Sequence, residues 1–312
     1  MFLCVSANPA IDKRISVRHF RAGAVNRAIG AVPEPGGKAA HVAMTLRGLG
    51  MKSSWIGFAG GATGQELVAG LERLGIECHA VRSRQPTRVN LAIVDEAAIV
   101  TEILEPGHPP SITELRIFRK QCEREFARGR SRATVILSGS LPAGTPSSLY
   151  ARLIESARRN GCRVFLDSSG DALRAGIQAH PDLVKPNREE AEALTGKAIR
   201  GVVSARRALM QIVSLGAKSA ALSLGREGLL WCAGPGQPVF HAQPPVVTGR
   251  SAVGSEQRAP AGVDGDQRAR RGLGPAAGGD PFDRRRRRVR HVRRRRPCQA
   301  SRRSSASRES RR

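Results

Sequence analysis

The sequence predicts an α/β protein with a largely parallel sheet and a second, smaller sheet outside it. Over the first 255 residues, short apolar runs alternate with helical patterns, as expected of βαβ units. Most of these runs end in small or polar residues, and function gathers at the carboxyl ends of such strands. Residues 87–104 instead alternate with the shorter period of half-buried strands. The chain has 312 residues, enough for one large α/β domain or two smaller ones.

Six apolar runs are predicted to be buried strands of the main sheet: FLCVSA (2–7), ATVILSGS (133–140), CRVFLDSS (162–169), DLVKPN (182–187), SAALSLG (219–225) and GLLWCA (228–233). Three segments between them carry apolar residues at three- and four-residue spacing and end at or near Gly: 66–75, 146–161 and 204–216. These segments are predicted to be crossover helices.

Two segments break this pattern, one at 13–28 and one at 87–104. The second suits two strands joined through Asp95-Glu96-Ala97. We therefore expect these two strands to form a small antiparallel sheet outside the main one that covers a site as a lid, and we place the lid segments at about 13–32 and 84–105.

The charge divides the chain in two. Residues 256–312 hold nineteen Arg, no Lys and six acidic residues, which supply half of the net charge of +26. They contain only five large apolar residues, too few to offset the entropy of ordering them, so a disordered tail is expected. Its clusters Arg284–Arg288 and Arg293–Arg296 would bind polyanions in low salt, but no aromatic residue is interleaved among them and no nucleic-acid module is recognisable.

The spacing of the cysteines and the length of the apolar runs indicate the cellular compartment of the protein. The six cysteines form no C-x-x-C pair and no His spacing, which indicates reduced thiols, without a disulfide framework or metal cluster. No run of eighteen apolar residues occurs, and residues 1–12 do not resemble a signal peptide. A soluble cytoplasmic protein with no membrane partner is expected.

Three motifs near the start suit an anionic sugar ligand. Gly37 and Lys38 form a glycine-lysine step into a helix, where backbone N–H groups and a lysine can hold a phosphate or polyol; an ordinary loop is the alternative. Asp12 follows the first strand and offers a carboxylate to a sugar hydroxyl, although helix caps and turns also favour Asp. Arg88 and Asn90 share one face of a lid strand, which could instead be a solvated face.

Two later motifs suit a nucleotide. Asn187 and Glu190 lie three apart at the start of a helix, where their oxygens would suit hydrated Mg²⁺; a helix capping box is the alternative. The segment Ser223–Gly228 is a strand followed by a turn with two glycines, which would let a nucleotide pass close to the backbone, but such turns are common.

The motifs NPAID, GGK, TRVN, TEILEPG, SGSLP, KPNREE and SLGREG, in this order, resemble the ribokinase-like (PfkB) family of sugar kinases, with the branch of 1-phosphofructokinase and tagatose-6-phosphate kinase most similar. The resemblance covers about residues 1–255. It implies a three-layer α/β/α sandwich with a β-sheet lid, often dimeric through the lid. It also implies transfer of the γ-phosphate of ATP to a phosphosugar hydroxyl with Mg²⁺.

The resemblance also implies roles for individual residues. The phosphosugar would be held by Asp12, Gly37, Lys38, His41, Arg88 and Asn90. ATP and Mg²⁺ would be held by Lys185, Asn187, Glu190, Ser223, Gly225 and Gly228, with Asn187 and Glu190 binding the metal through water. His41 departs from the family, which usually has Asn there, and its donor and acceptor layout is different.

A larger departure begins after Ser255. The family continues there with Gly-Asp, whose glycine amides form an anion hole and whose Asp is the general base, but this chain has Glu256 and Gln257. A Gln amide cannot act as that base, so no catalytic residue is assigned. The residues that follow lack the apolar periodicity of the family's last helices, so the C-terminal part of the fold is expected to be missing. Asp264 and Asp266 are poor substitutes for the base, because no glycine run or apolar helix accompanies them.

In GC-rich coding sequence, Ala codons read one base out of frame give Arg or Pro codons, so a frameshift near codon 255 would explain this tail. Three functions remain open. The chain is a phosphosugar kinase by descent that is inactive or severely impaired, a non-catalytic phosphosugar-binding protein, or a protein that binds polyanions incidentally through its tail. The motifs do not separate fructose 1-phosphate, tagatose 6-phosphate and fructose 6-phosphate.

Overall fold

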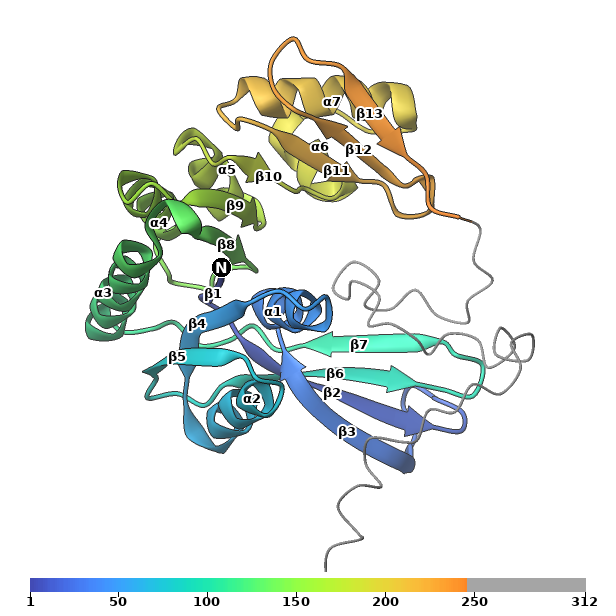
Figure 1. Ribbon diagram of the computed structural model, residues 1–312. Coiled ribbons are helices and arrows are strands. Elements are labelled where there is room, and N and C mark those ends of the chain that lie inside the picture. The colour runs from blue at the N-terminus through green and yellow to red at the C-terminus, as the bar shows by residue number, and fades with distance from the viewer. Residues whose placement is uncertain (246–312) are drawn as a thin grey trace, which may run out of the picture. The chain divides into compact units, whose positions relative to one another are not determined.

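Nine strands form the main sheet of the computed structural model, which describes residues 1–245 (Figure 1). All of these residues belong to one unit of the chain. Seven neighbouring strands, β5, β4, β1, β8, β9, β10 and β11, pair in parallel. Strands β12 and β13 are added antiparallel beside β11, at one edge. In spatial order they are β13 (Val239–Ala242), β12 (Leu229–Cys232), β11 (Ala220–Ser223), β10 (Leu183–Val184), β9 (Arg163–Asp167), β8 (Thr134–Ser138), β1 (Phe2–Ser6), β4 (Ser53–Ala59) and β5 (Glu77–Arg82).

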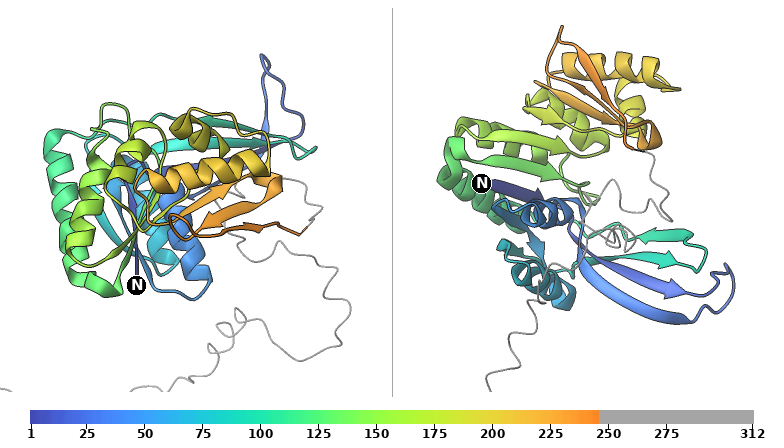
Figure 2. Two further views of the ribbon diagram at one scale, coloured as in Figure 1. Left: turned by 90° about the horizontal axis from the view of Figure 1, so that it is seen from above. Right: turned by 45° about the vertical axis from the view of Figure 1, so that its right-hand side comes forward.

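Helices lie on both faces of this sheet, so the described part is an α/β/α sandwich (Figures 1 and 2). On one face, α1 (Lys38–Gly48) and α2 (Gly61–Arg73) pack against β1, β4 and β5, and α1 also reaches β8. The other face carries α3 (Ile112–Gly129), α4 (Leu149–Arg159), α5 (Gly170–Gln178), α6 (Arg188–Thr195) and α7 (Val202–Ser214). Two short 3₁₀ turns, η1 (Arg130–Arg132) and η2 (Gly225–Glu227), complete the elements.

Burial follows the alternation of the strands. Leu3, Val5 and Leu137 point to the side of α3–α7 and join the larger apolar core. Cys4 and Trp55, paired across β1 and β4, point to the opposite side and form a second core with α1 and α2. Parallel strands buried on both faces need such a core on each side.

A separate four-stranded sheet extends away from the sandwich, as both views of Figure 2 show. Its order is β3 (Ala28–Gly36), β2 (Ala10–Val17), β6 (Arg88–Val94) and β7 (Val100–Leu104). The sheet expected as a lid is therefore present, and β6 and β7 are joined through the predicted turn at residues 95–97.

The antiparallel pair expected within residues 87–104 is confirmed by β6 and β7, but the sheet as a whole is mixed. β2 pairs in parallel with β6, and only the β2–β3 and β6–β7 pairs are antiparallel. The reason is topological, because α1, β4, α2 and β5 lie between the two hairpins in the chain and form a crossover.

The six predicted main strands and the three predicted helices are all present. Strands β4, β5 and β13 were not predicted. No helix within residues 1–245 is long and apolar enough to cross a bilayer. The domain boundary expected at 255/256, the disordered tail and the arginine clusters all lie outside the described residues.

Candidate active site

Asp12 is the centre of one group of predicted residues. It lies within strand β2, so it neither caps a helix nor forms a turn, and β1 already ends at Ser6. His41 Nε2 lies 2.6 Å from Asp12 Oδ2, and Asn90 Nδ2 donates to Asp12 Oδ1 at 2.8 Å. Asp12 and Asn90 are direct partners in the β2–β6 register. Arg88 lies two residues before Asn90 in β6, so the two share one face of the strand, as predicted.

The electrostatics of Asp12 favour its charged form. Burial raises the pKa of Asp12, but hydrogen bonds from His41, Asn90 and the backbone of Gly37 outweigh it, so the pKa lies below its ordinary value. A carboxylate at this position can accept a hydrogen bond that a sugar hydroxyl donates.

The glycine pair allows the chain to pass close to Asp12. A Cβ on Gly36 would lie 2.4 Å from Asp12 Cγ and 2.7 Å from the backbone N of Asp12. Gly37 has a φ of 83°, which other residues rarely adopt, and it is the N-cap of α1. Helix α1 then places Lys38 and His41, three apart, on one helical face.

Lys38 belongs to a second group, at the carboxyl edge of the main sheet. Its Nζ lies 3.2 Å from Oδ1 of Asp167, the last residue of β9, and 3.9 Å from Oε1 of Glu190. Lys185 follows β10, and its Nζ lies 3.6 Å from Asp167 Oδ2. Two lysines and two carboxylates therefore meet where parallel strands end.

Asp167 was not predicted as a site residue. Asp167 is the first charged residue after the apolar run VFL of β9. The same signal marks Lys185, which follows the apolar residues of β10. Its side chain is only 16 % exposed, between the two lysines.

The start of α6 contains the capping box that was the alternative for Asn187 and Glu190. Asn187 Oδ1 accepts from the Glu190 N–H at 2.8 Å, and Glu190 Oε2 accepts from the Asn187 N–H at 2.9 Å. The other carboxylate oxygen of Glu190 is the one near Lys38. Burial raises the pKa of Glu190 above its ordinary value, although the Asn187 N–H and the two lysines oppose the shift.

The predicted nucleotide turn is the next segment along the sheet edge. Ser223, the last residue of β11, bridges to Asn187, and its N–H donates to the Pro186 carbonyl. The Ser223 hydroxyl is buried and has no hydrogen-bond partner among the described residues. Gly225 and Gly228 both have positive φ; a Cβ on Gly228 would strike the Ala242 carbonyl oxygen at 2.1 Å, whereas a Cβ on Gly225 would meet nothing within 4 Å.

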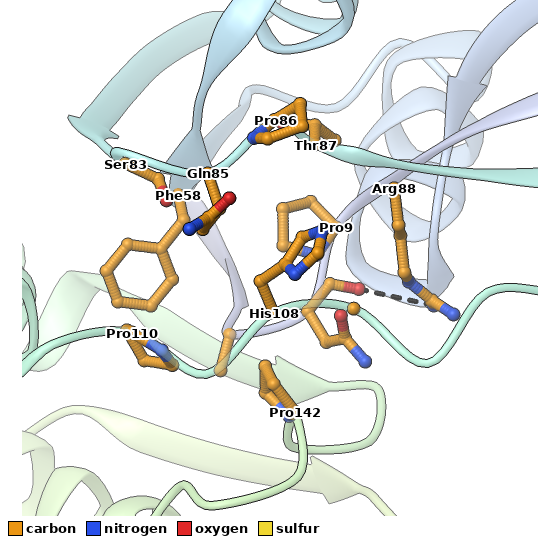
Figure 3. A pocket seen from close by; sticks show the side chains of 13 residues that line it. Pro9, Phe58, Ser83, Gln85, Pro86, Thr87, Arg88, His108, Pro110 and Pro142 are labelled. Carbon is orange, nitrogen blue, oxygen red and sulfur yellow. Dashed lines mark hydrogen bonds between the residues drawn. The ribbon is translucent and has the colours of Figure 1, made fainter.

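Arg88 differs from the other predicted residues because its guanidinium is bonded to loop carbonyls. Nη1 donates to the Glu105 carbonyl and Nη2 to the Asn8 carbonyl at 3.4 Å, the bond drawn dashed in Figure 3. A solvent-open hollow of about 340 Å³ lies beside it, and Arg88 is the only predicted site residue in its wall. The hollow is lined by Ala7, Asn8, Pro9, Phe58, Ser83, Gln85, Pro86, Thr87, Arg88, Gly107, His108, Pro110 and Pro142.

The two groups are adjacent along the chain, because Gly37 donates to Asp12 and the next residue, Lys38, reaches Asp167. Gln257, Asp264 and Asp266 lie outside the described residues. The helix-covered main sheet with its separate lid sheet, and the lysine–carboxylate cluster where the parallel strands end, match the expected architecture of the ribokinase-like class of carbohydrate kinases.

Comparison with known proteins supports this class of fold. The family model for pfkB family carbohydrate kinases matches residues 6–255, and this chain belongs to that family. The match ends at Ser255, after which the sequence was predicted to depart from the family.

Two curated relatives are 1-phosphofructokinases. That of Vibrio cholerae is 30 % identical over 260 residues, which are 83 % of this chain and 80 % of the relative. That of Rhodobacter capsulatus is 33 % identical and covers 83 % and 81 %. A crystal structure of phosphofructokinase-2 from Escherichia coli in complex with substrates and products has a TM-score of 0.75, 31 % identity and 82 % coverage of both chains.

Proposed function

We propose that this chain is an ATP-dependent phosphosugar kinase by descent that binds its ligands but transfers phosphate slowly or not at all. The observation that carries the proposal is the contact of Lys38 with Asp167 and Glu190, one residue away from the Gly37–Asp12 contact. A phosphate bound at Lys38 and a sugar hydroxyl bound at Asp12 would therefore be neighbours. The substrate would be a ketohexose phosphate such as fructose 1-phosphate or tagatose 6-phosphate, and a curated relative in Escherichia coli is named an ATP-dependent 6-phosphofructokinase.

On the sugar side, Asp12 and Asn90 would orient a hydroxyl. Arg88 and Lys38 would pair with the sugar phosphate, because each lies close to a partner of Asp12. Arg88 is two residues before Asn90 in β6, and Lys38 is one helical turn before His41 in α1. For Arg88 this requires the guanidinium to leave at least one of its carbonyl partners.

On the nucleotide side, the residues present fit ATP with hydrated Mg²⁺. Lys185 would neutralise phosphate charge, and the buried Ser223 hydroxyl, which has no partner among the described residues, could bond a nucleotide oxygen. Asn187 and Glu190, the predicted metal-binding residues, would bind the water shell of Mg²⁺ together with Asp167, whose charge acts on Glu190. The metal, when bound, would offset charge on the phosphates.

Impaired turnover is proposed because Gln257 stands where the family has its general base. Loss of a general base typically lowers a rate by about 10²- to 10⁴-fold. The chain also has Glu256 where the family has a glycine of the anion hole.

The test combines calorimetry with an assay of ADP release, using MgATP and each of the three phosphosugars. We expect binding of one phosphosugar, and ADP release at or below about a hundredth of that of the Vibrio cholerae relative. Asp12→Asn should weaken phosphosugar binding about ten- to a hundredfold, the worth of a hydrogen bond to a charged group. Asp95→Asn, in the lid turn of the same sheet, is the matched control and should bind normally. Turnover close to that of the relative would refute the impairment, and no binding of any phosphosugar would refute the proposed site.

A non-catalytic phosphosugar-binding protein is the second candidate. It is favoured by the intact Asp12–His41–Asn90 group together with Glu256 and Gln257 in the base segment. Binding without any detectable ADP release would support it.

We also propose that two copies associate through the lid. Apolar side chains of the lid are largely exposed: Val25, Ile29, Val32, Ile99, Ile103 and Leu104 are 51–86 % exposed. A partner copy would bury them. Sedimentation that shows only monomers at all concentrations would refute this.

The tail beyond residue 255 is proposed to bind polyanions only incidentally, and the protein to be cytoplasmic. Binding to a nucleic acid should therefore disappear near physiological salt. A sequence preference that persists there would overturn this.

A further inference from the structure

Among the described residues, helices cover one face of the main sheet from β5 to β12 but the other face only in part. Helices α3–α7 pack along the first face, from β5 to β12. On the second face, α1 and α2 cover β5, β4 and β1, and α1 reaches β8. Figures 1 and 2 show α6 and α7 both on the first side of β11 and β12.

A row of paired side chains marks the second face. Cys4 and Ile136 are paired across β1 and β8 and belong to the core under α1 and α2. Ile136 is paired with Phe165 on β9, and Phe165 with Leu183 on β10. Phe165 and Leu183 therefore point to the same face, but neither belongs to either apolar core of the described residues.

The row continues to the edge of the sheet. Ala221 on β11 is paired with Trp231 on β12, and Trp231 with Phe240 on β13. Trp231 is 40 % exposed and Phe240 is 56 % exposed, with ring centroids 5.5 Å apart. The strand neighbours of Trp231, Leu230 and Cys232, point to the opposite face and are 1 % exposed.

These strands need a second cover. Parallel strands occur almost only in sheets covered by helices on both faces, and β9, β10 and β11 are parallel. Because helices cover the rest of the same face, a helical segment with an apolar stripe is the cover that continues the layer. An exposed tryptophan–phenylalanine pair is typical of a surface that binds an apolar partner.

The chain's own residues after Ser255 are unsuited to this cover. Their 57 positions contain nineteen Arg and only five large apolar residues, without helical spacing. The matched relatives, by contrast, contain about a fifth of their length without a counterpart in this chain. The family match ends at Ser255, shortly after β13, the strand that carries Phe240.

We propose that the face formed by Phe165, Leu183, Trp231 and Phe240 is a docking surface that binds, in trans, an amphipathic helical segment with an apolar stripe. Docking buries the four side chains and completes the helical layer over β9–β13. The proposal does not depend on phosphosugar binding, which is measured separately.

The tryptophans provide the measurement. The chain has two, of which Trp55 is fully buried and Trp231 is partly exposed, so iodide quenching of the fluorescence reports on Trp231. The probe is the part of the Vibrio cholerae relative that follows its matched residues, made as a separate peptide and added to the full chain. We expect a blue shift and a loss of iodide quenching, and neither with a peptide of the same composition in scrambled order.

Matched variants locate the surface. Phe240→Ser should weaken docking, whereas Met210→Ser, a change of a similarly exposed apolar residue on α7 in the opposite layer, should leave it unchanged. Far-UV circular dichroism checks that each variant is folded. If the chain alone is insoluble, co-expression replaces the titration: the chain should co-purify with the tagged segment, and Phe240→Ser should lose this where Met210→Ser does not.

Three results would overturn the proposal. A folded chain whose Trp231 stays equally quenched in the presence of the segment has no such docking surface. Low quenching of the chain alone at every concentration would mean that its own residues cover the face. Quenching that falls as the chain concentration rises, without the segment, would identify a second copy as the occupant.

Discussion

His41 Nε2 and Asp12 Oδ2 lie 2.6 Å apart, which joins the first buried turn of helix α1 to the base of the lid. The contact uses the residue that departs from the family pattern, and it occupies one of the two oxygens with which Asp12 would bind a sugar. Asn90 occupies the other at 2.8 Å. The lid strands β2 and β6 and helix α1 are thus linked through one carboxylate, whose pKa is held below its ordinary value despite burial.

We expect His41→Asn to lower the free energy of unfolding at neutral pH by about 1–3 kcal/mol, the worth of a hydrogen bond to a charged group. The sign follows from the lowered pKa of Asp12. Its contribution is complete above the ordinary pKa of an aspartate and is lost as the pH falls through the lower pKa of the folded state. The difference between the chain and the variant should therefore shrink in acid.

Urea unfolding at a series of pH values measures this difference. His108→Asn, a change at an exposed histidine in a loop, is the control and should leave stability unchanged. A difference for His41→Asn that does not vary between neutral pH and acid would contradict the role given to Asp12.

Gly36→Ala should destabilise the protein by about 1–3 kcal/mol, because overpacking forces neighbouring atoms to move. The new methyl would lie 2.4 Å from Asp12 Cγ and 2.7 Å from the backbone N of Asp12. The Asp12 side chain could change its rotamer, but the backbone of β2 could not avoid the methyl in this way. Gly30→Ala is a matched control in the same strand, since its Cβ would meet nothing within 4 Å. Urea midpoints compare the two, and equal midpoints would show that the lid base is more adaptable than this geometry allows.

Glu190→Gln should keep or raise the melting temperature at neutral pH while weakening MgATP binding. Glutamine can retain the capping bond to the Asn187 N–H, and the substitution removes a charge whose burial raises the pKa of Glu190. The contribution of a raised pKa is complete below the ordinary pKa and is lost as the pH rises through the folded value, so the gain should disappear in acid.

Calorimetry with MgATP and thermal melts at two pH values test both halves of this prediction. Glu189→Gln, the exposed neighbour in the same helical turn, should change neither quantity. A lower melting temperature for Glu190→Gln at neutral pH would show that the attraction between Glu190 and Lys38 outweighs the cost of burial.

Local sequence signals identified most of the fold and much of the site. Apolar runs ending at Lys185 or Ser223 predict strands and place those residues at the sheet edge, because the strand period is visible locally. The parallel pairing of β2 with β6 could not be predicted in this way, since it depends on a crossover of four elements between them. Asp167 was missed although its position after β9 carries the same signal as Lys185, and only its contact with two lysines distinguishes it.

The tail beyond Ser255 yields the last prediction, which concerns the gene. The family match covers residues 6–255, and the composition changes at that point to one rich in Arg, Gly, Ala, Pro and Ser. We expect a fresh nucleotide read across codons 245–312, translated in all three frames, to reveal a frame that resumes with Gly-Asp and an apolar helix after Ser255. The chain made in that frame should then cover Phe165 and Trp231 with its own residues and should release ADP with a phosphosugar. If no frame does so, the present chain is the native product and lacks the family's base, so its function must lie in binding.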